Sequence, residues 1–204
     1  MQYLMHIGLG FVMAFFSLTP PGMLNMTAVR TAIEKGRKEG TWFSLGAALV
    51  VIPQAFVALV FAKFFAGHPE IVDRLNYAGV IVLFLLSVMF FFQARKKFKG
   101  AGSEKKGKSF LIGILMSSMN MLAIPFYLVL SSVLENRGLL ITKQPFINLF
   151  VTGVFFGAFS LFMVYTRFAA VIQKRAQFIA SNINYILSVL FFVLGILTLF
   201  KIMK

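Results

Sequence analysis

The most regular feature of this chain is a series of long apolar stretches separated by short polar ones. Crossing the hydrocarbon layer of a bilayer, about 30 Å thick, takes roughly 20 residues of apolar helix. We expect the stretches that approach or exceed this length to be membrane-spanning helices: Tyr3–Ala32, Thr41–Ala66, Leu75–Gln93, Ser109–Leu134, Phe146–Arg167 and Ile183–Phe200. The pattern therefore predicts an all-α membrane protein with six transmembrane helices, folded as a single transmembrane domain over residues 1–204.

The first and fourth stretches share an interruption by proline and asparagine. A straight helix over Tyr3–Ala32 would be about 45 Å long, which is too long for one span. Proline removes a helix hydrogen bond and pushes the preceding residue out of the α region. We expect both spans to break near the midplane, with these residues as break or gating positions: Pro20, Pro21, Gly22 and Pro125.

A basic segment over residues 95–108 divides the predicted spans into two groups of three. We expect this segment to be a cytoplasmic linker between a first half, residues 1–94, and a second half, residues 109–204. An odd number of spans in each half inverts the second half relative to the first. The paired broken spans are typical of transporters built from inverted repeats, in which they point to the binding site.

The charges between the spans predict the orientation. Of the 20 Lys and Arg residues, 14 follow the first, third and fifth spans. Cytoplasmic loops carry the excess of Lys and Arg, so both termini are expected on the extracytoplasmic side of the membrane. This use of the basic residues also explains the net charge of +14 without nucleic-acid binding.

Composition supports a protein that contacts the lipid bilayer. Hydrophobic residues make up 59% of the chain and charged residues 13%, against roughly 45–50% and 25% in soluble domains. The chain has no Cys, and all six Asp and Glu residues fall in loops or at span ends. No His, Asp and Glu cluster has the spacing of metal ligands or of an acid–base pair. We therefore expect no enzyme activity, no metal and no cofactor.

Uncharged polar residues near the breaks are the candidate site. A broken helix frees backbone carbonyls and exposes half-helix N-termini, which attract anions such as carboxylates. The residues that we expect to contact a small-molecule substrate, an amino acid or a similar polar solute, are Asn25, Asn120, Thr19, Ser117, Gln54 and Tyr127. The alternative is structural: such side chains also satisfy broken backbone or bond neighbouring helices.

The fifth span contains a Gly-Val-Phe-Phe-Gly sequence, in which Gly153 and Gly157 are four residues apart. Small residues at this spacing allow close helix contact in membranes. The pair is expected either to pack within the chain or to form a homodimer face, and the sequence does not separate the two.

The residues around both breaks resemble the LysE-type amino-acid exporters, also called the RhtB family. In that family a Pro-Gly-Pro break is followed by a helix of about a dozen residues and a Gly-Arg-Arg/Lys-x-Gly turn. Here Pro21-Gly22 is followed, at the family's spacing, by Gly36-Arg37-Lys38-Glu39-Gly40. The family's fourth span carries a Gly followed by Asn-Pro-Lys, and this chain has Gly113 followed by Asn120-Met121-Leu122.

The chain departs from the family pattern at three positions. Met23 replaces the second proline of the first motif, and Met121 and Leu122 replace the proline and lysine of the second. The missing lysine removes a positive charge that a substrate carboxylate would use. The resemblance implies a divergent member that exports amino acids or similar solutes by alternating access. The alternative from another class is a non-transporting membrane scaffold subunit of a complex.

Overall fold

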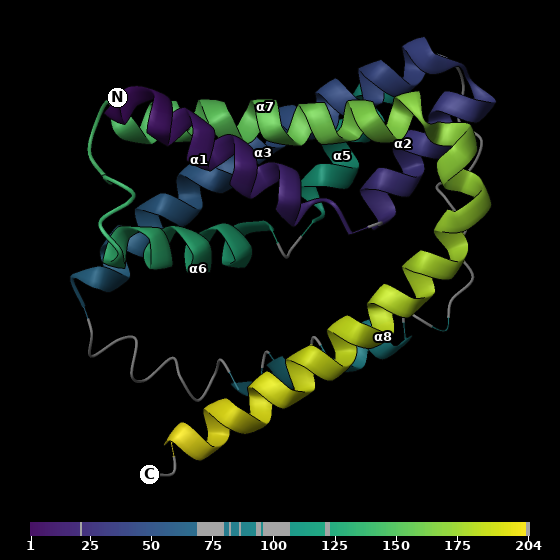
Figure 1. The fold of residues 1–204 in the computed structure, drawn as a ribbon. Coiled ribbons are helices and arrows are strands. Elements are labelled where there is room, and N and C mark those ends of the chain that lie inside the picture. The colour runs from purple at the N-terminus through teal and green to yellow at the C-terminus, as the bar shows by residue number, and fades with distance from the viewer. Residues whose placement is uncertain are drawn as a thin grey trace. The chain divides into compact units, whose positions relative to one another are not determined.

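A computed structural model describes residues 1–20, 22–68, 80–81, 83–85, 87–92, 95, 107–120 and 123–202. Every regular element in this part of the chain is a helix (Figure 1). In chain order the helices are α1 (Gln2–Ser17), α2 (Met23–Glu34), α3 (Arg37–Ala66), α5 (Ser109–Ser118), α6 (Ala123–Asn136), α7 (Phe146–Arg167) and α8 (Ala169–Ile202). The fold class predicted from the hydrophobic pattern is therefore confirmed as all-helical.

Length and composition identify the membrane-spanning helices among the described residues. Arg37–Phe64 of α3 and Phe146–Arg167 of α7 are long and apolar enough to cross a bilayer. The pair α5 and α6, bent by 63° at its break, becomes a third candidate if it is counted as one span. Gln2–Ser17, Leu83–Phe92 and Tyr185–Phe200 are shorter apolar helices. The first part of the predicted third span, residues 75–79, lies outside the described residues.

The chain divides into two compact units, Met1–Phe64 with Gly100–Lys174 and Phe65–Lys99 with Arg175–Lys204. The main hydrophobic core lies in the first unit, where Phe43 of α3 and both Phe150 and Phe162 of α7 are fully buried. In the second unit the hydroxyls of Ser87 and Ser188 each donate to the other's backbone carbonyl, at 2.8 and 2.9 Å.

Glycines bring α1 and α7 into backbone contact, and the two helices lie side by side in Figure 1. A Cβ atom added at Gly10 would overlap the Phe150 carbonyl oxygen, and one at Gly153 would overlap the Ile7 carbonyl. Gly157 faces the Phe11 carbonyl in the same way. Of the two expectations for Gly153 and Gly157, packing within the chain is the one that the structure bears out, because α1 covers both glycines.

A second pair of helices, α3 and α5, makes the same contact. A Cβ atom at Gly113 would overlap the Phe43 carbonyl, and one at Gly46 would overlap the Phe110 carbonyl. The spacing matches as well: Phe-x-x-Gly occurs at residues 43–46 and 150–153. On the partner helices, Gly113 and Gly10 likewise lie three residues after Phe110 and Ile7, whose carbonyls face Gly46 and Gly153. The helices of both pairs run in parallel, and each pair joins a helix of residues 1–94 to one of residues 109–204.

Helix α7 ends at Arg167, as predicted, but the start of α8 differs from the sequence expectation. Lys174 and Arg175 were expected in a loop before a span that begins at Ile183, but α8 already begins at Ala169. The polar stretch between Ala169 and Ile183 contains no helix-breaking residue. The first Gly after Ala169 is Gly195, and no Pro occurs after Ala169. Pro53 lies inside α3, which continues from Arg37 to Ala66.

Candidate functional site

The first break separates α1 from α2 at the predicted position. Helix α1 ends at Ser17, and α2 begins at Met23 after Gly22, which has the extended backbone of an N-cap residue (φ −107°, ψ −175°). Pro20 has no N–H to continue the helix, so the chain leaves the helical path here. Pro21, also predicted as a break residue, lies outside the described residues.

Side-chain donors occupy the carbonyls that this break sets free. Asn25 Nδ2 donates to the carbonyls of Leu18 and Pro20, at 2.6 and 3.0 Å. The hydroxyl of Tyr165 on α7 donates to the Thr19 carbonyl at 2.6 Å. Asn25 is 3% exposed, and its amide nitrogen is used in these two hydrogen bonds to backbone carbonyls.

Thr19 is engaged in the same way, because its hydroxyl donates to the Phe15 carbonyl at 2.8 Å. Tyr165 was not among the predicted site residues. The sequence signal that points to it is a lone phenol near the end of an otherwise apolar span.

The second break separates α5 from α6. Helix α5 ends at Ser118, the Asn120 N–H donates to the Ser117 carbonyl at 3.0 Å, and α6 begins at Ala123. Pro125 lies in the first turn of α6, where a missing N–H costs little. It therefore starts the second half-helix, and the interruption itself comes before it.

Gln54 of α3 reaches the end of α5. Its Nε2 donates to the Ser117 carbonyl at 2.9 Å, which brings two of the predicted residues together. The other amide atom, Gln54 Oε1, and the Ser117 hydroxyl are buried and have no hydrogen-bond partner. Gln54 is 8% exposed and Ser117 is 1% exposed. Buried polar groups are nearly always paired in folded proteins, so each such atom requires an explanation.

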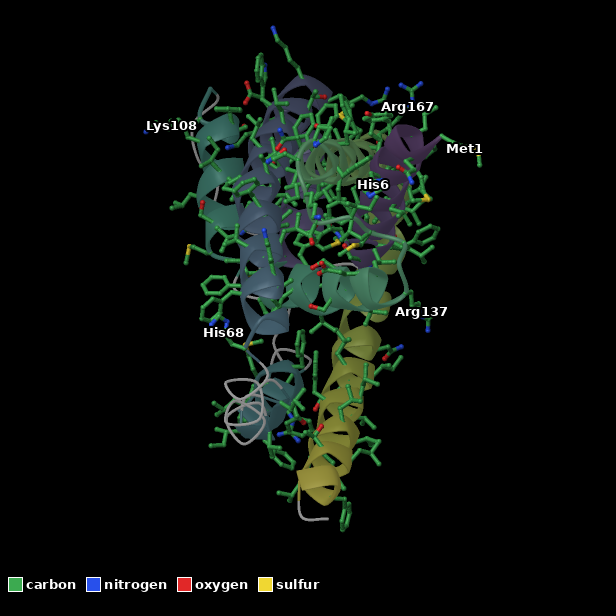
Figure 2. The ribbon with its side chains drawn as sticks, turned by 90° about the vertical axis from the view of Figure 1, so that its left-hand side faces the viewer. Met1, His6, His68, Lys108, Arg137 and Arg167 are labelled. Atoms are coloured by element: carbon green, nitrogen blue, oxygen red, sulfur yellow. The ribbon has the colours of Figure 1, made fainter. Side chains whose placement is uncertain are left out.

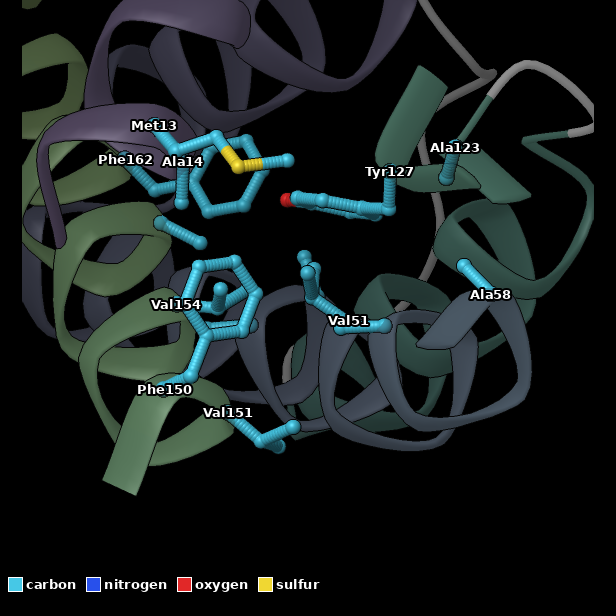
Figure 3. Packing of buried hydrophobic residues seen from close by; sticks show 14 of the residues in the cluster. Met13, Ala14, Val51, Ala58, Ala123, Tyr127, Phe150, Val151, Val154 and Phe162 are labelled. Carbon is cyan, nitrogen blue, oxygen red and sulfur yellow. The ribbon is translucent and has the colours of Figure 1, made fainter. Parts of the chain in front are cut away.

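Tyr127 of α6 presents a third polar atom of this kind. It is 2% exposed, and its oxygen has no hydrogen-bond partner. Figure 3 shows the phenol pointing into the core toward Met13. It lies close to Ser17 of α1, whose own hydroxyl donates to the Ala14 carbonyl at 3.0 Å.

The predicted residues thus fall into separate groups. Thr19 and Asn25 belong to the first break, and Gln54 and Ser117 to the second. Asn120 is partly buried beside the second break, and within the described chain no hydrogen bond joins it to Asn25.

Three charged residues, Lys108, Arg137 and Arg167, lie at helix ends or next to them. Lys108, Arg137 and Arg167 extend from the margin of the described side chains in Figure 2, while His6 lies inside. His6 is fully buried: its Nδ1 lies 2.7 Å from the Gln2 carbonyl, and its Nε2 accepts the Ile141 N–H at 3.0 Å. A cavity of about 310 Å³ lies at the end of α7, lined by Arg37, Arg167, Phe168, Ala170 and Val171. It includes none of the predicted site residues.

Comparison with protein families gives a match over most of the chain. The model of the family described as LysE type translocator matches residues 15–201, which include both breaks and the glycine-paired helices α3, α5 and α7. The chain belongs to this family. No curated protein and no solved structure matches it. The predicted family is therefore confirmed. The LysE type translocators are membrane transporters, so the chain is a membrane protein of the lipid bilayer with a small-molecule substrate.

Proposed function

We propose that this LysE type translocator exports amino acids or similar small polar solutes across the bacterial inner membrane by alternating access. Family membership carries the general part of this proposal. The observation that carries the solute class is the set of buried, uncharged and unpartnered polar atoms at the second break, Gln54 Oε1 and Ser117 Oγ. Uncharged amide and hydroxyl groups suit a polar solute that carries its own charges.

The proposal includes six spans arranged as two inverted halves. The equal register of the glycine contacts supports the repeat: Gly10 on Phe150 and Gly113 on Phe43 place equivalent backbone atoms together. In each case the first half-helix of a broken span packs on a helix of the other half. Broken spans at the interface of inverted repeats are the usual location of a transporter's solute site.

The experiment that tests export is efflux from cells preloaded with a pool of labelled amino acids, with and without the protein. Faster loss of one compound or a small set is the expected result, and it also names the solute. Unchanged loss across the whole pool would contradict amino-acid export.

A non-transporting scaffold subunit is the alternative, and family membership gives it no support. A single Cys at position 117 of this Cys-free chain separates the two functions. In a transporter, a soluble thiol reagent reaches this Cys while the protein cycles, although Ser117 is 1% exposed in the present conformation. A scaffold leaves it unreactive. A Cys at position 131, where Ser131 is equally buried on α6, is the matched control.

A further inference from the structure

The two breaks occupy equivalent places in the chain but differ in how far their polar groups are satisfied. At the first break, three successive backbone positions, Leu18, Thr19 and Pro20, have carbonyls that accept from Asn25 or Tyr165. At the second break, Gln54 satisfies one carbonyl while its own oxygen and the neighbouring Ser117 hydroxyl stay without partners. The first break is therefore complete in itself, whereas the second is not.

The unpartnered atoms at the second break are mainly acceptors. An amide oxygen has two lone pairs and donates nothing, and a hydroxyl oxygen has two lone pairs and one proton. Both atoms lie at the C-terminal end of α5, where the last carbonyls of a helix lack helical donors. The helix dipole makes this end negative, and half-helix C-terminal ends coordinate cations in transporters.

The charge expected of the ligand follows from the positions of the carboxylates relative to these atoms. Divalent cations in proteins take carboxylate ligands, but the described acids, Glu34, Glu39 and Glu135, lie at or near helix ends, whereas Gln54 lies inside α3. Two uncharged oxygens beside a helix C-terminus suit a group with a single positive charge. Such a group either donates hydrogen bonds to the oxygens, as an ammonium does, or is coordinated by their lone pairs, as a sodium ion is.

From these contacts we infer that Gln54 Oε1 and Ser117 Oγ, at the end of α5, bind a monovalent cationic group, whereas the Asn25 break is structural. The group is the ammonium of the transported solute or a sodium ion, which share this chemistry. The inference rests on the proposed transport function and assigns different roles to its two breaks.

Thermal unfolding of the purified full-length protein tests the assignment. The unfolding temperature is measured with NaCl against choline chloride at equal ionic strength, since choline is bulky and has no N–H. It is also measured with each amino acid of the pool against the matching carboxylic acid that lacks the amine. A ligand that binds only the folded protein raises the unfolding temperature, and its stabilisation grows with the logarithm of one plus its concentration over its Kd.

Ser117→Ala is the test variant, because it removes one unpartnered hydroxyl and leaves the Gln54 bond to the Ser117 backbone carbonyl in place. A hydrogen bond to a charged group contributes about 1.5–3 kcal/mol, so the variant's affinity is expected to fall at least about tenfold. Ser131→Ala is the control, since Ser131 is equally buried but its hydroxyl donates to carbonyls of its own helix.

Stabilisation by sodium identifies the ion, and stabilisation by amino acids but not by their deaminated counterparts identifies the ammonium. Either result supports the inference if Ser117→Ala weakens it and Ser131→Ala does not. No stabilisation by either ligand, or equal stabilisation in Ser117→Ala, overturns it. Efflux that continues in that case leaves the transport function standing, whereas binding without efflux contradicts the function and retains the site.

Discussion

Asn25 and Ser117 are both buried polar residues beside a helix break, yet removing their side chains has opposite consequences. The Asn25 amide is the donor for two carbonyls that no helical N–H reaches. The Ser117 hydroxyl has no partner to lose. An unpaired buried polar group costs about 1–3 kcal/mol, and this cost appears on mutation only when a partner is left behind.

We predict that Asn25→Ala lowers the free energy of unfolding by about 1–3 kcal/mol, because it leaves the Leu18 and Pro20 carbonyls unpaired. Ser117→Ala is predicted to be neutral or stabilising in the absence of ligand. Unfolding of both variants in the same detergent, in choline chloride, measures the difference. A loss of stability in Ser117→Ala as large as that in Asn25→Ala would show that the hydroxyl has a partner after all.

Tyr165→Phe is predicted to destabilise the protein by about 1 kcal/mol, since it removes the hydroxyl that the Thr19 carbonyl accepts. Tyr127→Phe, which removes an unpartnered hydroxyl from the same residue type, is the control and is expected to leave stability unchanged or raised. Thermal unfolding of the two variants compares them directly. Equal losses in both would contradict the hydrogen-bond assignment at the first break.

The sequence located the breaks better than it located the roles of the residues around them. The lack of an N–H in proline acts on the helix locally, so the C-terminal end of α1 and the start of α2 followed from Pro20 and Gly22. The donor to the Thr19 carbonyl is Tyr165, 146 residues away, and only the packing of α7 brings it there. The function of the remaining predicted residues stays a prediction.

Among the elements, the contacts between α1 and α7 and between α3 and α5 depend on glycine because backbone meets backbone. A methyl group at Gly10 or Gly153 would have to occupy the position of a carbonyl oxygen in the facing helix. The Gly153–Gly157 spacing was visible in the sequence. The Phe-x-x-Gly sequences at 43–46 and 150–153 were equally visible, but their equivalence becomes meaningful only when the partner helices are known.

Gly153→Ala is predicted to destabilise the protein by about 1–3 kcal/mol or more, because α1 has to move away from α7 to admit the methyl group. Gly8→Ala is the matched control on α1, where an added Cβ meets nothing within 4 Å. There the change is expected to stabilise the helix by up to about 1 kcal/mol through helix propensity. Expression level and thermal unfolding measure both variants, and equal behaviour would contradict the close contact.

For the molecule as a whole, the glycine contacts bear on how alternating access would occur. If the two sequence halves rocked against each other, α1 would separate from α7 and α3 from α5. At these contacts the helix backbones touch directly at glycines, without side chains between them. Packed elements of this kind shift between discrete arrangements more readily than they deform. We therefore expect the pairs α1–α7 and α3–α5 to move as units in the proposed transport cycle.

The proposed orientation predicts which surfaces face the outside of the cell. In the Cys-free chain, a membrane-impermeant thiol reagent is expected to label Arg137→Cys in intact cells. It should label Lys108→Cys and Arg167→Cys only after the cells are opened; all three positions are exposed in the structure. Labelling in the reverse order would overturn the predicted orientation of the termini.

The contact between α1 and α7 also determines the order in which the fold can be completed during synthesis. Helix α1 leaves the ribosome first, and its partner follows after about 130 further residues, which takes several to about thirty seconds at 5–20 residues per second. Throughout that time Gly10 has no helix to cover it. A ribosome that stops at the linker therefore releases a chain in which neither α1 nor α3 has met its partner. The membrane insertion machinery, or the lipid itself, has to keep this 16-residue helix in place until the second half arrives.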